Sequence, residues 1–164
     1  MYDRNTFLGA IRTKSTLSES IKESAITRVA VLNKAWYEYE HHAVLALNPG
    51  KLPLAGLKYI TTSPARGPHK PNKEIGIDEQ HAAVLEYTDC MTLDCEVPEG
   101  VFQRLKAVFS EREVVEVTAT VGAYNCVSRF LVALDVSERN GEEGMRMSLK
   151  HVSPELEDLT PASR

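Results

Sequence analysis

Apolar residues recur at spacings of three and four along most of the chain, which is the period of a helix with one buried face. Turn residues and capping residues separate these periodic stretches. The pattern predicts helices over residues 3–12, 16–32, 33–47, 78–91, 98–109 and 110–136, a short apolar piece at 54–60 and a short segment at 145–152. We therefore expect an all-α domain of about six to seven helices.

The longest apolar run, residues 114–136, fits two patterns. Val115, Val117 and Val121 alternate with polar residues as in a strand, whereas Val117, Val121 and Tyr124 also satisfy the helical period. Residues 110–113, Ser-Glu-Arg-Glu, have the form of a capping box, and no hairpin turn follows the run. These two features favour a helix.

Proline and glycine are concentrated in residues 48–77. Long segments without periodicity are often functional loops, so residues 61–73 are a candidate lid. Arg66, His69 and Lys70 in this loop could receive an anionic substrate, or they could belong to a solvated connector.

Length and composition narrow the class of protein. With 164 residues, 43% of them hydrophobic, we expect one domain over 1–164, a core at about 8–137 and a loose tail at about 153–164. The 19 basic and 23 acidic residues are interspersed, which argues against nucleic acid as a partner. No apolar run approaches the roughly 18 residues of a membrane span, and residues 1–6 do not resemble a secretory signal. The expected location is the cytoplasm.

The three cysteines do not follow the spacing of a disulfide-rich secreted domain. Cys90 and Cys95 are five apart, which fits neither a redox Cys-x-x-Cys motif nor a usual zinc spacing. A metal site that combines them with His81 is the minor alternative to a role as small core residues. We expect no metal.

The predicted helix over 33–47 carries the most suggestive chemistry. Glu38 and His42 are four apart and therefore one helical turn from each other, beside the aromatic residues Trp36 and Tyr39. A carboxylate in this position can hold an imidazole in one tautomer and so prepare it for proton transfer. The alternative is a surface ion pair on an amphipathic helix.

Four segments together resemble the carboxymuconolactone decarboxylase family, which shares its all-helical fold with the alkylhydroperoxidase D (AhpD) group. They are residues 22–30, 37–43, 109–113 and 123–130. The resemblance covers roughly residues 8–137 in the family's order. It implies an AhpD-like helical domain that assembles into a homo-oligomer, a trimer or a hexamer.

In the peroxidase branch of this group, a glutamate precedes a Cys-x-x-Cys pair and a histidine follows the second cysteine by four residues. Glu23 and His42 match that glutamate and that histidine, but Ala35 and Glu38 occupy the cysteine positions. The dithiol supplies the electrons that reduce a peroxide. We therefore expect no thiol peroxidase activity, and only Cys126 offers an alternative thiol.

In the decarboxylase branch, the resemblance implies no thiol, metal or organic cofactor. Glu23, Glu38 and His42 are the candidate catalytic residues: His42 moves the proton, Glu38 orients it, and Glu23 faces both from the neighbouring helix. Loss of carbon dioxide from an unsaturated acid or lactone leaves a dienolate, which needs electrostatic stabilisation and then a proton.

The candidate substrate-binding residues are Tyr37, His41, Tyr124, Asn125 and Arg129. Arg129 suits a carboxylate because of its planar fork, although it could equally bridge helices or subunits. His41 points about 100 degrees away from His42 around the helix, which favours a surface role.

The resulting hypothesis is a cofactor-free lyase or isomerase that acts on a small unsaturated acid, lactone or aromatic metabolite. The alternatives are a peroxidase-like relative without dithiol chemistry and a catalytically silent oligomeric binding protein.

Overall fold

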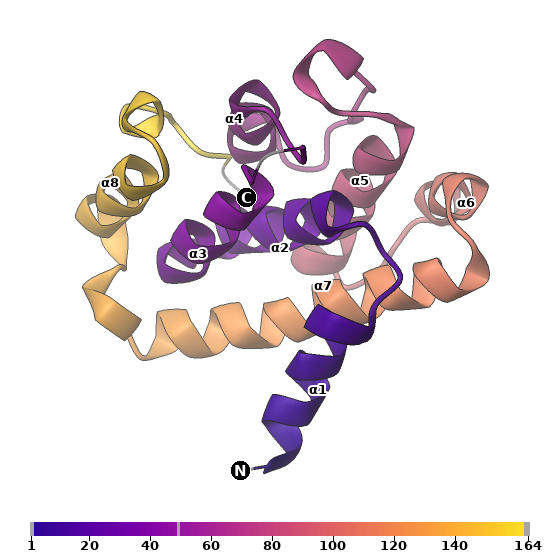
Figure 1. Ribbon diagram of the computed structural model, residues 1–164, viewed down its shortest axis with the longest axis horizontal. Coiled ribbons are helices and arrows are strands. Elements are labelled where there is room, and N and C mark those ends of the chain that lie inside the picture. The colour runs from indigo at the N-terminus through magenta and orange to yellow at the C-terminus, as the bar shows by residue number, and fades with distance from the viewer. Residues whose placement is uncertain (1, 49, 163–164) are drawn as a thin grey trace.

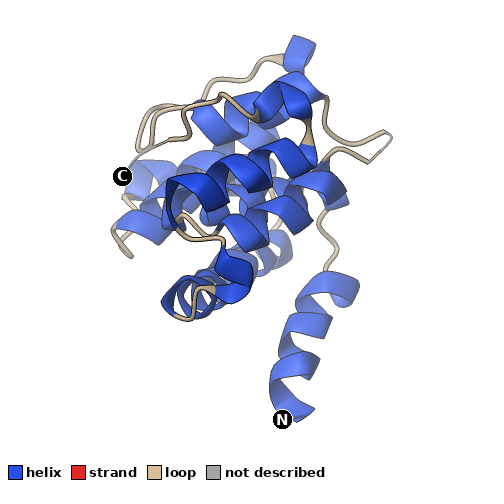
Figure 2. Ribbon diagram, turned by 90° about the vertical axis from the view of Figure 1, so that its left-hand side faces the viewer, coloured by secondary structure: helices blue, strands red, loops and turns tan. Residues whose placement is uncertain are grey.

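A computed structural model describes residues 2–48 and 50–162, and in this part of the chain helices are joined by loops and there is no strand, only an isolated β-bridge between Asn72 and Ile77 (Figures 1 and 2). Eight α-helices and three short 3-10 helices follow one another within it. They are α1 Tyr2–Lys14, α2 Glu19–Asn33, α3 Trp36–Ala46, α4 Leu54–Thr62, η1 Lys73–Ile75, α5 Glu79–Leu93, α6 Glu99–Val108, α7 Glu111–Ala133, η2 Val136–Glu138, α8 Gly141–Val152 and η3 Pro154–Leu156. In the described ranges, no helix is long and apolar enough to cross a membrane.

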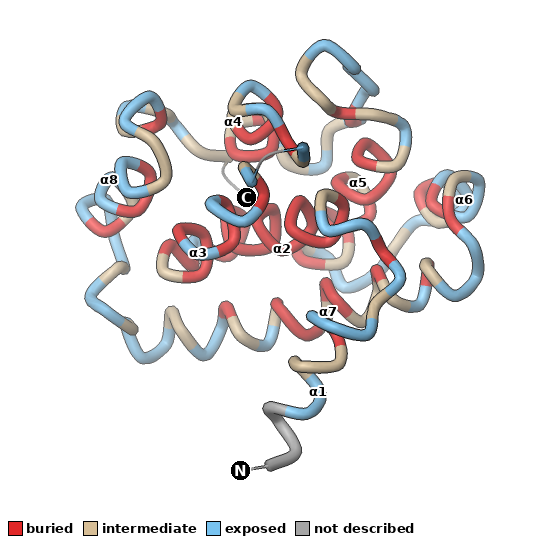
Figure 3. Tube along the Cα trace, viewed as in Figure 1, coloured by how far each residue is buried: buried red, intermediate tan, exposed pale blue. Residues whose placement is uncertain are grey.

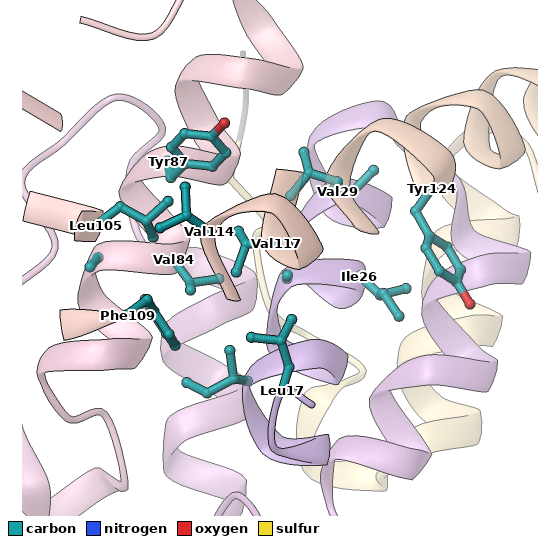
Figure 4. Close-up of a cluster of buried hydrophobic side chains, with 14 of the residues drawn as sticks. Leu17, Ile26, Val29, Val84, Tyr87, Leu105, Phe109, Val114, Val117 and Tyr124 are labelled. Carbon is teal, nitrogen blue, oxygen red and sulfur yellow. The ribbon is translucent and has the colours of Figure 1, made fainter. Parts of the chain in front are cut away.

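Helix α2 is the centre of the fold and is buried from Ile21 to Asn33 (Figure 3). It packs against α3, α4, α5 and α7. One half of α2 joins a cluster with α5, α6 and α7 that includes Ile26, Val84 and Val117 (Figure 4). The other half joins a second cluster with α3, α4 and the C-terminal segment. The buried residues of α2 include charged side chains, among them Lys22, Glu23 and Arg28, so its burial on all sides does not follow from an apolar stripe.

A buried ion pair fixes α2 to α5. Arg28 Nε and one terminal nitrogen donate to the two carboxylate oxygens of Asp89 at 2.7 and 2.9 Å, and both side chains are fully buried. The other terminal nitrogen of Arg28 donates to the carbonyl oxygens of Ile60 and Ser63. The guanidinium group therefore also satisfies backbone groups at the C-terminal end of α4.

Two helix boundaries differ from the predicted ones. The cap of α2 is Ser18, whose Oγ accepts from the Ile21 N–H, rather than Thr16, whose N–H and hydroxyl donate to Glu116. Asn33 is the last residue of α2 rather than the cap of α3. The chain turns at Lys34, which adopts a left-handed conformation.

Helix α7 confirms the helical interpretation of the apolar run over residues 114–133, and the helix ends three residues before the predicted end at 136. The predicted capping box is present, because Ser110 Oγ accepts from the Glu113 N–H and the Glu113 carboxylate accepts from the Ser110 N–H. The second half of this helix is less buried than its pattern suggested: Val127 is only half-buried and Phe130 is exposed.

The C-terminal segment, expected to be a loose tail, lies against the helices. Leu156 is fully buried, and the Ala162 N–H donates to the Thr61 carbonyl oxygen at 2.8 Å. The buried Glu40 of α3 accepts hydrogen bonds from Ser148 of α8 and from Arg139 just before it. These contacts hold the last part of the chain on α3 and α4.

Candidate active site

Helices α2, α3 and α7 bring Glu23, His42 and Tyr124 together. His42 Nδ1 lies 2.7 Å from Glu23 Oε2, and the two side chains are only 11% and 8% exposed. The edge of the His42 ring meets Tyr124, with the ring centres 4.8 Å apart and the planes at 83°. Two residues from other helices, Glu23 and Tyr124, therefore contact the imidazole of His42.

The Glu23 contact selects one tautomer of His42. A carboxylate only accepts hydrogen bonds, so Nδ1 carries a hydrogen and donates it to Glu23. This leaves Nε2 to bind a proton, and no group in residues 2–48 or 50–162 forms a hydrogen bond with it. A fixed tautomer with an available ring nitrogen is the arrangement of a general acid–base histidine.

Glu38 contacts Ser128 and not His42. The residue that orients His42 is therefore Glu23, and not Glu38 as predicted. The Glu38 side chain is buried, and Oε1 accepts from the Ser128 hydroxyl at 2.8 Å. Oε2 has no hydrogen-bond partner in the described part of the chain. Burial raises the pKa of Glu38 to about 8, although the Ser128 hydroxyl and the positive charge of Arg12 act in the opposite direction. Glu38 is therefore protonated at neutral pH.

This raised pKa makes the stability of the fold depend on pH. Between about pH 4.5 and pH 8 the unfolded chain ionises at Glu38 while the folded chain keeps its proton, so stability is present at low pH and is lost as pH rises. Replacing Glu38 with Gln removes this ionisation. We expect Glu38→Gln to raise the free energy of unfolding at pH 7 by about 2–3 kcal/mol relative to the parent, with little difference near pH 4.

Urea unfolding of both proteins from pH 4 to pH 8 measures this effect. Glu143→Gln, at an exposed glutamate of α8, is the matched control and should follow the parent protein at every pH. If the free energies of unfolding of the parent and of Glu38→Gln changed in parallel with pH, Glu38 would ionise as an ordinary surface carboxyl group.

Arg12 and Ser128 lie next to the site, and neither was among the residues predicted from the sequence. Arg12 Nε donates to the Tyr124 hydroxyl at 2.9 Å. Burial raises the pKa of Tyr124, so this side chain remains a phenol near neutrality. Ser128 is four residues after Tyr124 and therefore faces the same side of α7, a spacing that could have identified it. Arg12 reaches the site only through the tertiary placement of α1.

Two of the proposed substrate-binding residues lie on the outside of α3. The exposed His41 donates from Nδ1 to the Tyr37 carbonyl oxygen at 2.8 Å, and its ring packs against the Tyr37 ring. Neither side chain contacts the Glu23–His42 pair.

Asn125 connects α7 to two other helices, and Arg129 binds Asn125 within α7. Asn125 accepts from Asn33 Nδ2 and donates to the Thr92 hydroxyl, which joins α7 to α2 and α5. Arg129 is exposed and donates to both the backbone and the side-chain oxygen of Asn125. Asn125 therefore joins three helices, whereas the hydrogen bonds of Arg129 in the described part of the chain stay within α7 and do not bridge helices.

The candidate lid is tied to α5. Arg66 forms a double hydrogen bond with Asp94, and the buried His69 contacts Asp89 through Nε2 and the Tyr59 hydroxyl through Nδ1. Their charged groups therefore already have protein partners. Lys70 is exposed.

The thiols lie apart from His42. Cys126 is two residues after Tyr124, which turns it roughly 200 degrees around α7, and it is exposed whereas Tyr124 is buried. Cys90 is buried in the α5 cluster and Cys95 is exposed after α5. His81 contacts Asp78 and Ser20. Across the described ranges, no group of three or more His, Cys, Asp or Glu residues is placed to hold a metal ion.

The fold is found in a known structure. A crystal structure of a protein of unknown function from Agrobacterium tumefaciens, suggested to be the antioxidant defence protein AhpD, superimposes with a TM-score of 0.65. It is 21% identical, and the match covers 78% of this chain and 82% of that one. No family model matches the chain, and neither does any curated protein. The likeness shows an AhpD-like all-helical fold.

Proposed function

We propose that the protein is a cofactor-independent lyase or isomerase that transfers protons through His42 on a small unsaturated acid, lactone or aromatic metabolite. The observation that carries the proposal is the 2.7 Å contact between His42 Nδ1 and Glu23, which leaves Nε2 to exchange a proton. Glu23 then stabilises the imidazolium that forms when Nε2 is protonated.

Two related reactions use the same groups. In an isomerisation, Nε2 takes a proton from the carbon beside a carbonyl group, the electron pair delocalises as an enolate, and the imidazolium returns the proton to another carbon. In a decarboxylation, the electrons of the broken carbon–carbon bond form the enolate as carbon dioxide leaves, and the imidazolium protonates it. Water then reprotonates His42.

Neutral donors near His42 support an enolate intermediate. The Tyr124 phenol and the protonated Glu38 place no negative charge of their own beside the ring at neutral pH. A developing enolate is stabilised by such donors when they are held in place before the reaction. Arg12 adds a positive charge on the Tyr124 side.

A substrate screen in D₂O tests the proposal. The intact protein is incubated with a panel of unsaturated acids, lactones and aromatic acids, and ¹H NMR follows deuterium incorporation and carbon dioxide loss. We expect enzyme-dependent exchange or decarboxylation of at least one compound, without added metal or reductant. Compounds that bind without exchange or turnover would instead indicate a binding protein.

The same protein should not reduce peroxide by a thiol mechanism. No thiol lies at the positions of Ala35 and Glu38, and Cys126 faces away from Tyr124. We expect hydrogen peroxide consumption with a dithiol reductant to stay at the rate of the reductant alone. Faster consumption that disappears in Cys126→Ser would overturn the acid–base proposal in favour of a thiol peroxidase.

A further inference from the structure

A largely apolar cavity of about 370 Å³ lies between α1 and the second half of α7. In Figure 1, α1 extends from the helical body beside α7. The volume of the cavity lies within the roughly 300–1,000 Å³ that is typical of pockets for small molecules. The residues that matter for its chemistry are Leu8, Arg12, Cys126, Val127, Phe130 and Leu131.

Among the residues that the structure describes, Arg12 is the only charged side chain in the wall of this cavity. Its Nε is held by the Tyr124 hydroxyl, and the guanidinium carbon lies 5.9 Å from the centre of the Tyr124 ring. No carboxylate of the described residues forms an ion pair with it. Its terminal nitrogens therefore keep the paired donors that bind a carboxylate in a planar double hydrogen bond.

We propose that this cavity binds a small organic acid with an apolar body, whose carboxylate pairs with Arg12 and whose hydrocarbon part packs between α1 and α7. An apolar wall with one cation complements that distribution of charge. The assignment of this acid as a substrate rests on the proposed function, whereas its binding does not.

The charges near Arg12 favour an anionic ligand. Glu38 is within electrostatic reach of Arg12, but its raised pKa leaves it neutral below about pH 8. Glu23 is engaged by His42. Contacts also lead from the cavity to the reaction centre, because Arg12 touches Tyr124 and the Tyr124 ring touches His42. Arg12 is therefore connected to His42 through the Tyr124 side chain, which lies between them.

Cys126 provides a reporter of occupancy, because it lines the cavity and is exposed. Alkylation by N-ethylmaleimide, followed by peptide mass spectrometry, gives its rate in the full-length protein. Octanoate and 1-naphthoate are the probes. We expect either acid at saturation to slow alkylation of Cys126 at least about five-fold, whereas Cys95, exposed outside the cavity, keeps its rate.

Three comparisons separate the contributions of charge and apolar area. Acetate has the carboxylate without a long hydrocarbon part, and octanamide has the hydrocarbon part without the charge. Neither compound should protect Cys126 at the concentration at which octanoate does. Arg12→Met retains an unbranched apolar side chain but removes the cation, and should raise the octanoate concentration needed for half-protection by about ten-fold. Arg146→Met, at an exposed arginine of α8, should leave it unchanged.

Each contrary result has a distinct meaning. Undiminished protection in Arg12→Met would remove Arg12 as the carboxylate partner, and absence of protection by both acids would remove the cavity as their site. Protection that grows with protein concentration in the absence of acid would show that a second copy covers the cavity. Protection that persists in a protein without turnover would retain the binding site and reject the proposed reaction.

Discussion

Replacing His42 with Ala lowers the turnover of any substrate found in the screen by about 10²–10⁴-fold, the usual contribution of a positioned general acid or base. The loss should appear mainly in kcat, because His42 transfers a proton in the transition state and is not needed to bind the substrate. Glu23→Gln should lower kcat less severely. Gln can still accept the hydrogen from Nδ1, but it lacks the negative charge that stabilises the imidazolium.

Steady-state kinetics on matched variants checks this result. His151→Ala removes an exposed histidine of α8 and is the control, with kinetics equal to those of the parent. Circular dichroism should show that His42→Ala retains its helices. A His42→Ala protein with unchanged kcat would exclude His42 from the mechanism.

Replacing Asp89 with Asn destabilises the fold by about 3–5 kcal/mol, because it leaves the guanidinium of Arg28 buried without a counter-charge. The same change weakens the contacts of Asp89 with His69 and with the Arg66 N–H. Burial alone would raise the pKa of Asp89, but hydrogen bonds from Arg28 and His69 hold it below its usual value. Its stabilising contribution is therefore present above roughly pH 4 and declines as pH falls.

Chemical denaturation at pH 7 measures the loss. Asp94→Asn is the matched control, because Asp94 makes a similar double hydrogen bond with Arg66 but at the surface. An exposed pair contributes about 0–1 kcal/mol, so this variant should stay close to the parent protein. If both variants lost the same free energy, the Arg28–Asp89 pair would have no special role in the fold.

The fold was predictable because helical periodicity and capping chemistry are local. The capping box at Ser110 occurs as the sequence indicated, and Asp78, the first residue of the predicted helix over 78–91, caps α5. The boundary between α2 and α3 was misplaced because Asn33 is a good cap by residue type, while the left-handed turn at Lys34 gave no signal of its own. The C-terminal segment looked polar and loose because its attachment depends on Leu156 and on a single backbone hydrogen bond.

The candidate site was only partly predictable. Glu23 and His42 lie together, but their pairing required the packing of α2 against α3, which spacing within one helix cannot show. The spacing of Glu38 and His42 suggested the wrong carboxylate partner, because Glu38 turns towards Ser128 of α7. No sequence pattern could have identified the contact of Arg12 with Tyr124, because 112 positions separate the two residues.

The burial of Glu38 also means that folding consumes a hydrogen ion from the solvent. At pH 7 the newly synthesised chain carries an ionised Glu38, and this group is enclosed only when Ser128 of α7 docks against it. Docking of α7 is thus coupled to proton uptake. The heat of unfolding measured by calorimetry will consequently contain the ionisation enthalpy of the buffer, and will differ between phosphate and Tris.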